Sequence, residues 1–195
     1  MVAHRSALGM AEHEILVGLV RRRPVCLALA KHAGLRTLNV VRRAESVKPL
    51  LDAGADVVLV EGADFTEQAS DAVGDASLEL ILDAVAGEPV AQLASLLKID
   101  GQIVSYTARA RQPLSIPVMD LIYRGLRVHG YWLNLWLRRT PRDTVAKTYH
   151  ELATLVADCI LAAPIEATYA LSDYREAIAH AARNDRNGKV LFALR

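Results

Sequence analysis

Short apolar runs alternate with helical patterns along most of the chain. The runs are nearly continuous in apolar residues, which is typical of strands that are covered on both faces of a parallel sheet. The strands predicted in this way are 37–41, 57–60, 78–83, 102–106, 126–131, 165–170 and 189–194. A further run at 15–20 is compatible with a first strand, whereas residues 1–14 show no clear period and are assigned no structure.

Stretches with apolar residues at helical spacing lie between these strands. The predicted helices are 25–33, 46–54, 89–101, 117–125 and a segment that follows Ser172. In the 89–101 helix, Leu96 and Leu97 extend the apolar face and Gly101 ends the element. The longest helix begins at a capping box at 140–143, has an apolar stripe and ends at Pro164. This alternation predicts an α/β fold with a Rossmann-like, doubly wound parallel sheet.

Composition narrows the class of protein without identifying it. The 195 residues suit one domain, and 23 basic against 22 acidic residues give a net charge of +1, which indicates neither a nucleic-acid nor a membrane partner. Cys26 and Cys159 are far apart in sequence, so no disulfide framework is expected. No apolar run approaches the roughly 18 residues that cross a bilayer, and the N-terminus lacks the order of a secretory signal. We therefore expect a cytoplasmic protein.

The residues that follow each predicted strand are the candidates for chemistry, because open parallel sheets bind ligands at the carboxyl ends of their strands. Arg42 and Arg43 follow strand 37–41, where arginine favours the 2′-phosphate of NADP, although a solvated strand end fits equally well. Asp83 precedes a turn of small residues that lets a cofactor approach the backbone. Asp83 itself is either a functional carboxylate or, as is commoner, a cap or loop acid.

An aromatic segment, HGYWLNLW at 129–136, follows strand 126–131 and holds both tryptophans. It is either a hydrophobic plug or one wall of a pocket for a flat cofactor or an acyl chain. The histidines lie far apart and show no metal-ligand spacing, so no metal site is expected. The chain also lacks an HExxH motif, a phosphate-binding P-loop, a GxSxG nucleophile elbow, and a tyrosine followed four residues later by lysine.

With these pieces in order, the chain from about residue 33 onward resembles the cofactor-binding half of the medium-chain dehydrogenases/reductases. Within that superfamily it is most similar to the zinc-independent 2-enoyl thioester reductases, of the mitochondrial trans-2-enoyl-CoA reductase type. The segments that carry the resemblance are GLRTLNVVRR (34–43), LILDAVAG (80–87), GQIVSYTARARQPLSIP (101–117), LIYRGLRVHGYWLNLW (121–136) and LSDYREAIAHAARNDRNGKVLFAL (171–194). GYWLNLW is the most specific of them.

The resemblance implies an NADP cofactor and a role for each matching residue. Arg42 would bind the 2′-phosphate with help from Arg43, and Lys189 would approach the cofactor from the tail. The residues expected along the ribose and nicotinamide are Tyr106, Thr107, Ala108, Arg109, Tyr131, Trp132 and Leu133. The family reduces the 2,3 double bond of an acyl thioester with hydride from NADPH.

Two departures from the family change what we expect of this chain. The family's catalytic tyrosine belongs to a preceding GroES-like domain, which we expect to be missing here, so no catalytic residue is assigned within the chain. The first βα turn, which is glycine-containing in relatives, reads RRRP at 21–24, so the backbone cannot approach a pyrophosphate closely. We therefore divide the chain into an irregular or non-native lead-in at 1–24 and an NADP-binding domain at 25–195.

Two functional hypotheses follow from this comparison. The first is a truncated cofactor-binding portion of an NADPH-dependent enoyl-thioester reductase or quinone-reductase-like enzyme, weakly active or inactive alone. The second is a non-catalytic Rossmann module that binds NADP weakly, or associates with a full-length partner or a second copy through the sheet edge near 126–131. A methyltransferase that uses the 80–87 turn ranks last, because it explains neither GYWLNLW nor the tail.

Overall fold

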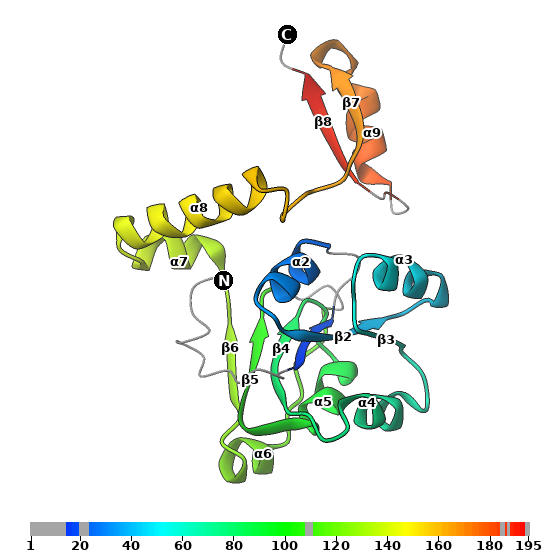
Figure 1. Ribbon diagram of the computed structural model, residues 1–195, viewed down its shortest axis with the longest axis vertical. Coiled ribbons are helices and arrows are strands. Elements are labelled where there is room, and N and C mark those ends of the chain that lie inside the picture. The colour runs from blue at the N-terminus through cyan, green and yellow to red at the C-terminus, as the bar shows by residue number, and fades with distance from the viewer. Residues whose placement is uncertain (1–14, 20–23, 108–110, 184–185, 187, 194–195) are drawn as a thin grey trace.

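A six-stranded parallel sheet forms the centre of the molecule. The computed structural model describes residues 15–19, 24–107, 111–183, 186 and 188–193. The strands are β1 (Ile15–Leu19), β2 (Arg36–Val41), β3 (Val57–Val60), β4 (Leu78–Asp83), β5 (Leu97–Ser105) and β6 (Arg127–Gly130), and they lie in the order β3-β2-β1-β4-β5-β6 (Figure 1). Every neighbouring pair is parallel. The strand order reverses direction between β1 and β4, as in a doubly wound sheet.

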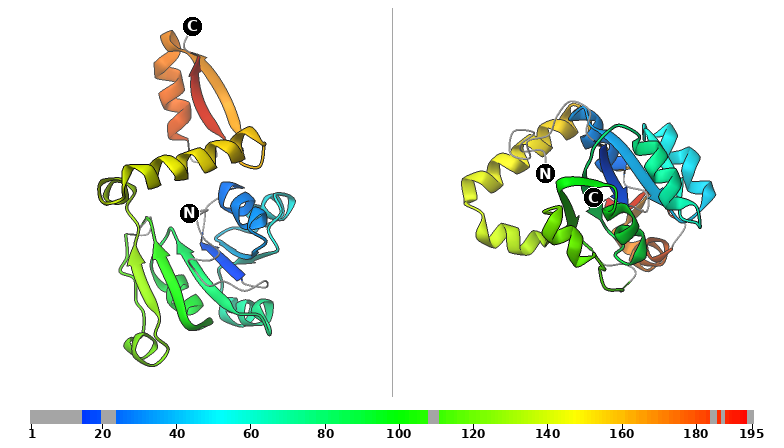
Figure 2. Two further views of the ribbon diagram at one scale, coloured as in Figure 1. Left: turned by 60° about the vertical axis from the view of Figure 1, so that its left-hand side comes forward. Right: turned by 90° about the horizontal axis from the view of Figure 1, so that it is seen from below.

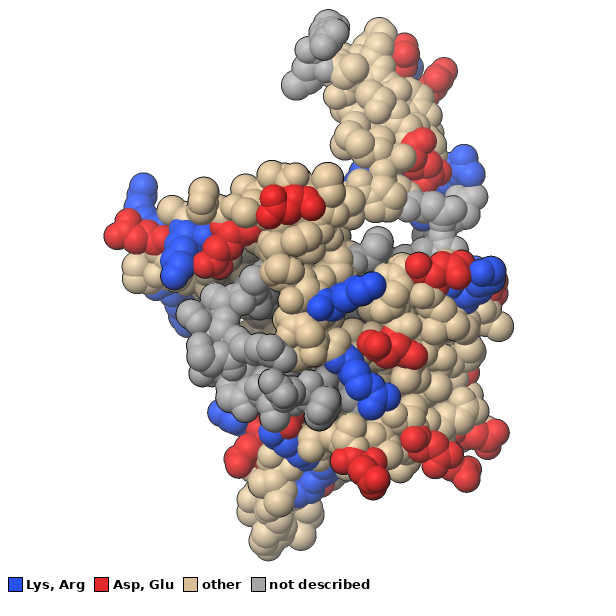
Figure 3. Space-filling model, in the orientation of Figure 1, with Lys and Arg blue, Asp and Glu red and all other residues tan. Residues whose placement is uncertain are grey.

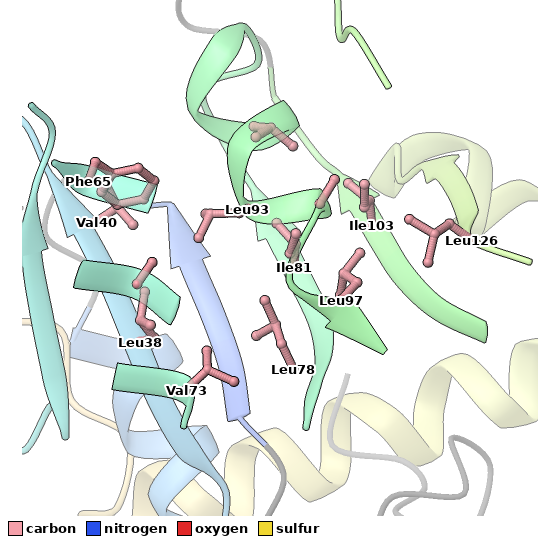
Figure 4. Packing of buried hydrophobic residues seen from close by; sticks show 13 residues of the cluster. Leu38, Val40, Phe65, Val73, Leu78, Ile81, Leu93, Leu97, Ile103 and Leu126 are labelled. Carbon is pink, nitrogen blue, oxygen red and sulfur yellow. The ribbon is translucent and has the colours of Figure 1, made fainter. Parts of the chain in front are cut away.

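Helices cover both faces of this sheet. One face packs against α4 (Phe65–Val73) and α5 (Glu88–Ala94), and the other against α2 (Pro24–His32) and α3 (Val47–Asp52) (Figure 1). Successive residues of β2 point to opposite faces of the sheet. Val40 packs in the same cluster as Phe65 of α4, whereas Val41 packs in the cluster of Leu27 and Leu50. Figure 4 shows the largest of the buried clusters, in which Phe65 and Ile81 are almost completely buried. The alternation of buried positions along the strands therefore builds a core on each face of the sheet.

The C-terminal part of the chain lies apart from this sheet. After β6 come α7 (Leu133–Arg139) and α8 (Arg142–Ala157), and α8 crosses beyond the carboxyl ends of the strands (Figures 1 and 2). Beyond α8, β7 (Ile165–Ala170) and β8 (Lys189–Ala193) form a separate two-stranded parallel sheet, with α9 (Tyr174–Ala182) on it. We call β7, α9 and β8 the C-terminal unit. At the opposite end of the large sheet lies α6 (Val118–Tyr123).

The structure confirms most of the predicted strands and corrects two of the helices, of which the first is the one predicted at 89–101. The helix predicted at 89–101 ends at Ala94, and Leu97 begins β5, with Gly101 inside that strand. Arg124 contacts this junction, because its guanidinium donates hydrogen bonds to the carbonyls of Ala94 and Leu97. These carbonyls are thereby satisfied outside a helix, so the chain can turn directly into the next strand.

The longest predicted helix also differs from expectation. α8 ends at Ala157, well before Pro164, and no side chain caps its first turn, so the capping box at 140–143 does not form. Its apolar stripe is largely exposed, since Tyr149 and Val156 both face solvent and only Leu155 is buried. The apolar spacing thus predicted the helix correctly but not its burial. Helices α4 and α7 were not predicted.

The first strand belongs to the sheet in the structure. β1 pairs with β2 on one side and with β4 on the other, so it occupies a central position. It lies inside the 1–24 range assigned to a lead-in, and the boundary at residue 24 stays a prediction. Within the described residues, no helix is both long and apolar enough to cross a membrane. On the face shown in Figure 3, basic and acidic side chains are interspersed.

Candidate functional site

The carboxyl ends of the strands gather most of the predicted site residues at one edge of the sheet. Arg42 and Arg43 follow β2, Asp83 ends β4, Tyr106 follows β5 and Tyr131 follows β6. The reversal of strand order between β1 and β4 divides this edge into a β2–β3 side and a β4–β6 side. A dinucleotide bound at such a reversal crosses from one side to the other. The turn at 20–23, which carries the three arginines, lies outside the described residues.

On the β2–β3 side, both arginines are exposed and face acidic partners. The Nε atom of Arg42 lies 3.9 Å from Oε2 of Glu61, and a guanidinium nitrogen of Arg43 lies 3.5 Å from Oε1 of Glu45. These pairs are solvent-exposed and therefore weak, so a phosphate can compete for either guanidinium. Glu61 was not singled out in the sequence, although it follows β3 directly and the rule applied to the other strands would have found it.

A pocket of about 300 Å³ adjoins this arginine side. Its lining comes from the residues after β3 and from the start of α5: Glu61, Gly62, Ala63, Phe65, Glu88, Pro89 and Gln92. Two carboxylates and one amide make its polar lining acceptor-rich. It opens at the same edge of the sheet as Arg42, through their shared neighbour Glu61.

On the β4–β6 side, Asp83 is completely buried and fully hydrogen-bonded. Its Oδ1 accepts hydrogen bonds from the backbone N–H groups of Val85 and Ala86, both at 2.8 Å, and its Oδ2 accepts one from the hydroxyl of Ser105 at 2.5 Å. Of the two alternatives that the sequence left open, the burial of Asp83 and its bonds to the loop favour a loop acid. Ser105, its partner at the end of β5, was not singled out in the sequence.

The turn after β5 continues this side of the edge. The N–H of Tyr106 donates to the carbonyl of Asp83 at 3.0 Å, and the Tyr106 ring packs beside Ala30 and Leu82. Thr107 is half-buried at the next position. Ala108 and Arg109 lie outside the described residues, so their predicted roles along the nicotinamide stay predictions.

The aromatic segment after β6 is more exposed than a hydrophobic plug would be. Tyr131 is 40% exposed and Trp132 60%, and Leu133 begins α7 with its side chain also exposed. The backbone N–H of Tyr131 donates to the carbonyl of Ser105 at 2.8 Å, which fixes the segment to the end of β5. Partial burial raises the pKa of the Tyr131 phenol, and the neighbouring Tyr149 raises it further.

Lys189 is not among the residues that the sheet edge brings together. It begins β8 in the C-terminal unit, is exposed, and its backbone N–H donates to the carbonyl of Pro164 at 2.7 Å. Its predicted approach to a cofactor stays a prediction. The described residues also contain no group of three or more His, Cys, Asp or Glu side chains that fits a metal ion.

Together, the parallel sheet with its reversal and the residues at its carboxyl edge define a Rossmann-like unit of the kind that binds dinucleotides. Comparison with known proteins agrees. The sequence pattern of a family described as zinc-binding dehydrogenase matches residues 25–164, and the chain belongs to that family. Despite the family's description, the part of the chain that the structure describes offers no set of side chains suited to zinc.

Curated relatives share the enoyl-reductase resemblance. The chain is 27% identical to a mitochondrial enoyl-[acyl-carrier-protein] reductase of Dictyostelium discoideum, over 86% of this chain and 49% of that protein. It is 31% identical to the protein of the same description from Rattus norvegicus, over 78% of this chain and 42% of the relative. The chain thus spans about half the length of these relatives.

Solved structures share the fold. A complex of Etr1p with NADP and crotonyl-CoA superimposes with a TM-score of 0.80 at 19% identity, covering 99% of this chain and 57% of that one. A mitochondrial 2-enoyl thioester reductase Etr1p/Etr2p heterodimer from Candida tropicalis gives a TM-score of 0.75 at 18% identity, covering 88% and 52%. The C-terminal unit is included in the first of these matches, because almost the whole chain is covered.

Proposed function

We propose that this chain is the NADP-binding portion of an NADPH-dependent oxidoreductase that reduces enoyl thioesters, or of a related quinone reductase. The observation that carries the proposal is the arrangement of the carboxyl edge, with exposed Arg42 on one side of the strand reversal and a small-residue loop after β4 on the other. The named relatives, which are enoyl reductases, support the reaction class. The NADP complex among the structural neighbours supports the cofactor.

In this proposal each part of the edge has its own task. Arg42, released from Glu61, binds the 2′-phosphate through its planar guanidinium, and Arg43 assists. Tyr106 and Thr107 border the ribose and nicotinamide, and Tyr131 closes the far side with Trp132 and Leu133. NADPH, when bound, supplies the hydride. Ala108, Arg109 and Lys189 keep the cofactor contacts that the family resemblance implies.

The same proposal predicts weak or no turnover by the chain alone. We assign none of the described side chains as proton donor to an acyl thioester, because the family resemblance places the catalytic tyrosine in a separate GroES-like domain. A missing general acid lowers the rate by about 10²–10⁴-fold. The chain would then hold NADPH while the remaining half of a full-length enzyme supplies the substrate pocket and the proton.

Cofactor titration tests the proposal directly. We expect the purified chain to quench or enhance NADPH fluorescence saturably and to bind NADPH more tightly than NADH. Arg42→Ala should remove that preference, and Arg36→Ala, at the opposite end of β2, is the matched control because it removes an exposed arginine far from the carboxyl edge. Equal binding of NADPH and NADH by the unaltered chain would contradict the assignment of Arg42. Reduction of crotonyl-CoA at ordinary enzyme rates would contradict the predicted inactivity.

A second candidate function is association without catalysis. β6 is an edge strand whose residues are all exposed, with Val128 40% exposed, and α6 beside it exposes Ile122 and Tyr123. Unpaired edge strands readily add another strand, so we propose that this edge forms a homodimer or pairs with a full-length relative. Sedimentation measurements should show a dimer that Val128→Lys dissociates. A chain that is monomeric at all concentrations would contradict this candidate.

A further inference from the structure

The hydrogen bonds of Asp83 lock the loop after β4 into one conformation. In loop 84–87, Ala86 has a φ of 65° and Gly87 a φ of 87°, so two successive residues adopt left-handed conformations. Such a conformation costs an alanine about 1–2 kcal/mol and needs compensation from its surroundings. The Asp83 carboxylate supplies it, because its Oδ1 accepts the N–H groups of Val85 and Ala86 at 2.8 Å.

These bonds also decide how the loop can meet a ligand. The two N–H groups are directed to a buried carboxylate and are not available to a phosphate. The side chains of Ala84 and Ala86 are themselves buried, so the surface of the loop is formed by backbone and small side chains. Loop 84–87 is therefore unsuited to binding phosphate and suited to lying against a flat or apolar group.

Asp83 connects this loop to the ends of the two next strands. Its Oδ2 accepts the hydroxyl hydrogen of Ser105 at the end of β5, and its carbonyl accepts the N–H of Tyr106. The carbonyl of Ser105 in turn accepts the N–H of Tyr131 after β6. The loop after β5 also returns over loop 84–87, since a Cβ atom at Gly87 would lie only 2.6 Å from Oε1 of Gln112.

We propose that Asp83 and Ser105 are a positioning pair that orders the β4–β6 side of the edge for the nicotinamide half of the cofactor. This inference rests on the proposed function, in which NADP lies across the strand reversal. Asp83 touches no ligand itself; it acts through loop 84–87 and, by way of Ser105, through Tyr131. The pair lies on the opposite side of the reversal from Arg42, so the adenosine half is held independently of it.

Binding of two different ligands distinguishes the contributions of the two halves of the site. NADPH spans both sides, whereas adenosine 2′,5′-bisphosphate contains only the phosphate-bearing adenosine half. Each is titrated into the unaltered chain and into Asp83→Ala, Ser105→Ala and Asp83→Asn. We expect Asp83→Ala to weaken NADPH binding at least about tenfold, since it removes three hydrogen bonds from the loop and its neighbour, and Ser105→Ala to weaken it about threefold. Neither variant should change binding of adenosine 2′,5′-bisphosphate by more than about twofold.

Asp83→Asn provides the conservative control. Its Oδ1 can still accept both loop N–H groups, and its amide can donate to the Ser105 hydroxyl, which can also act as an acceptor. Binding of NADPH by this variant should therefore stay within about threefold of the unaltered chain. Ser105→Ala and Asp83→Asn keep the test decisive if Asp83→Ala does not fold, which its thermal unfolding would show.

Each outcome has one meaning. Selective weakening of NADPH by Asp83→Ala and Ser105→Ala, with recovery in Asp83→Asn, supports the positioning pair. Equal loss of both ligands, or unchanged NADPH binding, overturns it while leaving the proposed function intact. Failure of the unaltered chain to bind either ligand overturns the proposed function, and the positioning role with it.

Discussion

The two parallel sheets of this protein differ in what covers them. In the six-stranded sheet, Leu78, Ile81 and Ile103 are fully buried on the face that α4 and α5 cover, and Val41 and Leu82 are buried on the other face. In the C-terminal unit, Ile165, Leu191 and Phe192 remain exposed, although parallel strands are normally covered on both sides. A two-stranded sheet is also at the limit of independent stability. We conclude that the large sheet has a buried core of its own, whereas the C-terminal unit depends more on local polar contacts.

A hydrogen-bonded cluster provides those polar contacts. His180 of α9 lies between two residues of β7, with its Nδ1 2.9 Å from the Tyr169 hydroxyl and its Nε2 2.9 Å from Oε1 of Glu166. Oε2 of Glu166 accepts the N–H of Gly188 just before β8. A single histidine thus connects the helix to both strands, directly to β7 and through Glu166 to the start of β8.

The sharpest way to test this comparison is to remove an apolar side chain from each region. Leu93→Ala should lower the free energy of unfolding by about 2–5 kcal/mol, because it leaves a cavity in the main core. Ile178→Ala in α9 should change it by less than about 0.5 kcal/mol, since that side chain is exposed. Urea unfolding measures both. A comparable loss in the two variants would mean that the C-terminal unit is packed in solution.

Removing the histidine should loosen the C-terminal unit alone. His180→Ala leaves Tyr169 and Glu166 without their shared partner, at a cost of about 1–3 kcal/mol to local stability. Hydrogen exchange should then quicken in β7 and β8 and stay unchanged in β4 and β5. His150→Ala, an exposed position on α8, is the control. Faster exchange throughout the chain would show that the two sheets unfold as one unit.

Alanine substitution at two glycines tests the backbone strain in loop 84–87 at the edge of the large sheet. Gly87→Ala should cost about 1–2 kcal/mol, because the residue has a φ of 87° and its new methyl group would meet Gln112. Gly62→Ala, where the added carbon finds no atom closer than 4.0 Å, should be nearly neutral. Thermal unfolding of both variants gives the difference. Equal effects would argue against a constrained loop at 84–87.

The smallest expected effect concerns pH at the junction between the sheet and its C-terminal extension. Because the pKa of Tyr131 is raised in the folded protein, the folded state keeps this proton to higher pH than the unfolded state does. Stability should therefore fall as pH rises beyond the ordinary tyrosine pKa of 10.0. Tyr131→Phe should flatten that part of the pH profile slightly, and Tyr149→Phe should lower the Tyr131 pKa in an absorbance titration. An unchanged profile in Tyr131→Phe would contradict the assignment.

Local sequence patterns predicted the central sheet well, because its buried strands are short runs of apolar residues that can be recognised in the sequence. In the central sheet, the predicted strands 57–60 and 78–83 coincide with the observed ones. The strand predicted at 165–170 also coincides with an observed one, β7 of the C-terminal unit. Where distant residues contribute, the prediction failed: α5 ends at Ala94, whose carbonyl accepts a hydrogen bond from Arg124, 30 positions away. The exposure of Val156 likewise depends on where α8 lies in the fold, and the spacing of apolar residues does not predict that position.

The candidate site was predictable only in part, for the same reason. The rule that ligands bind after parallel strands pointed to Arg42, Asp83 and Tyr131, and the structure gathers all three at one edge. It did not reveal that Asp83 bonds to Ser105, because that contact depends on the pairing of β4 with β5. Ala108 and Arg109 stay predictions, as does the role of Lys189.

The central position of β1 has a consequence for the order in which the chain is synthesised. β2 and β3 extend the sheet from one side of β1, whereas the other side must wait until β4, which ends at residue 83, has emerged. Until then β1 presents an unpaired edge, and such edges attract wrong partners in nascent chains. During synthesis, β1 therefore emerges well before β4, its second partner in the sheet. In that interval we expect the chain to depend most on chaperones.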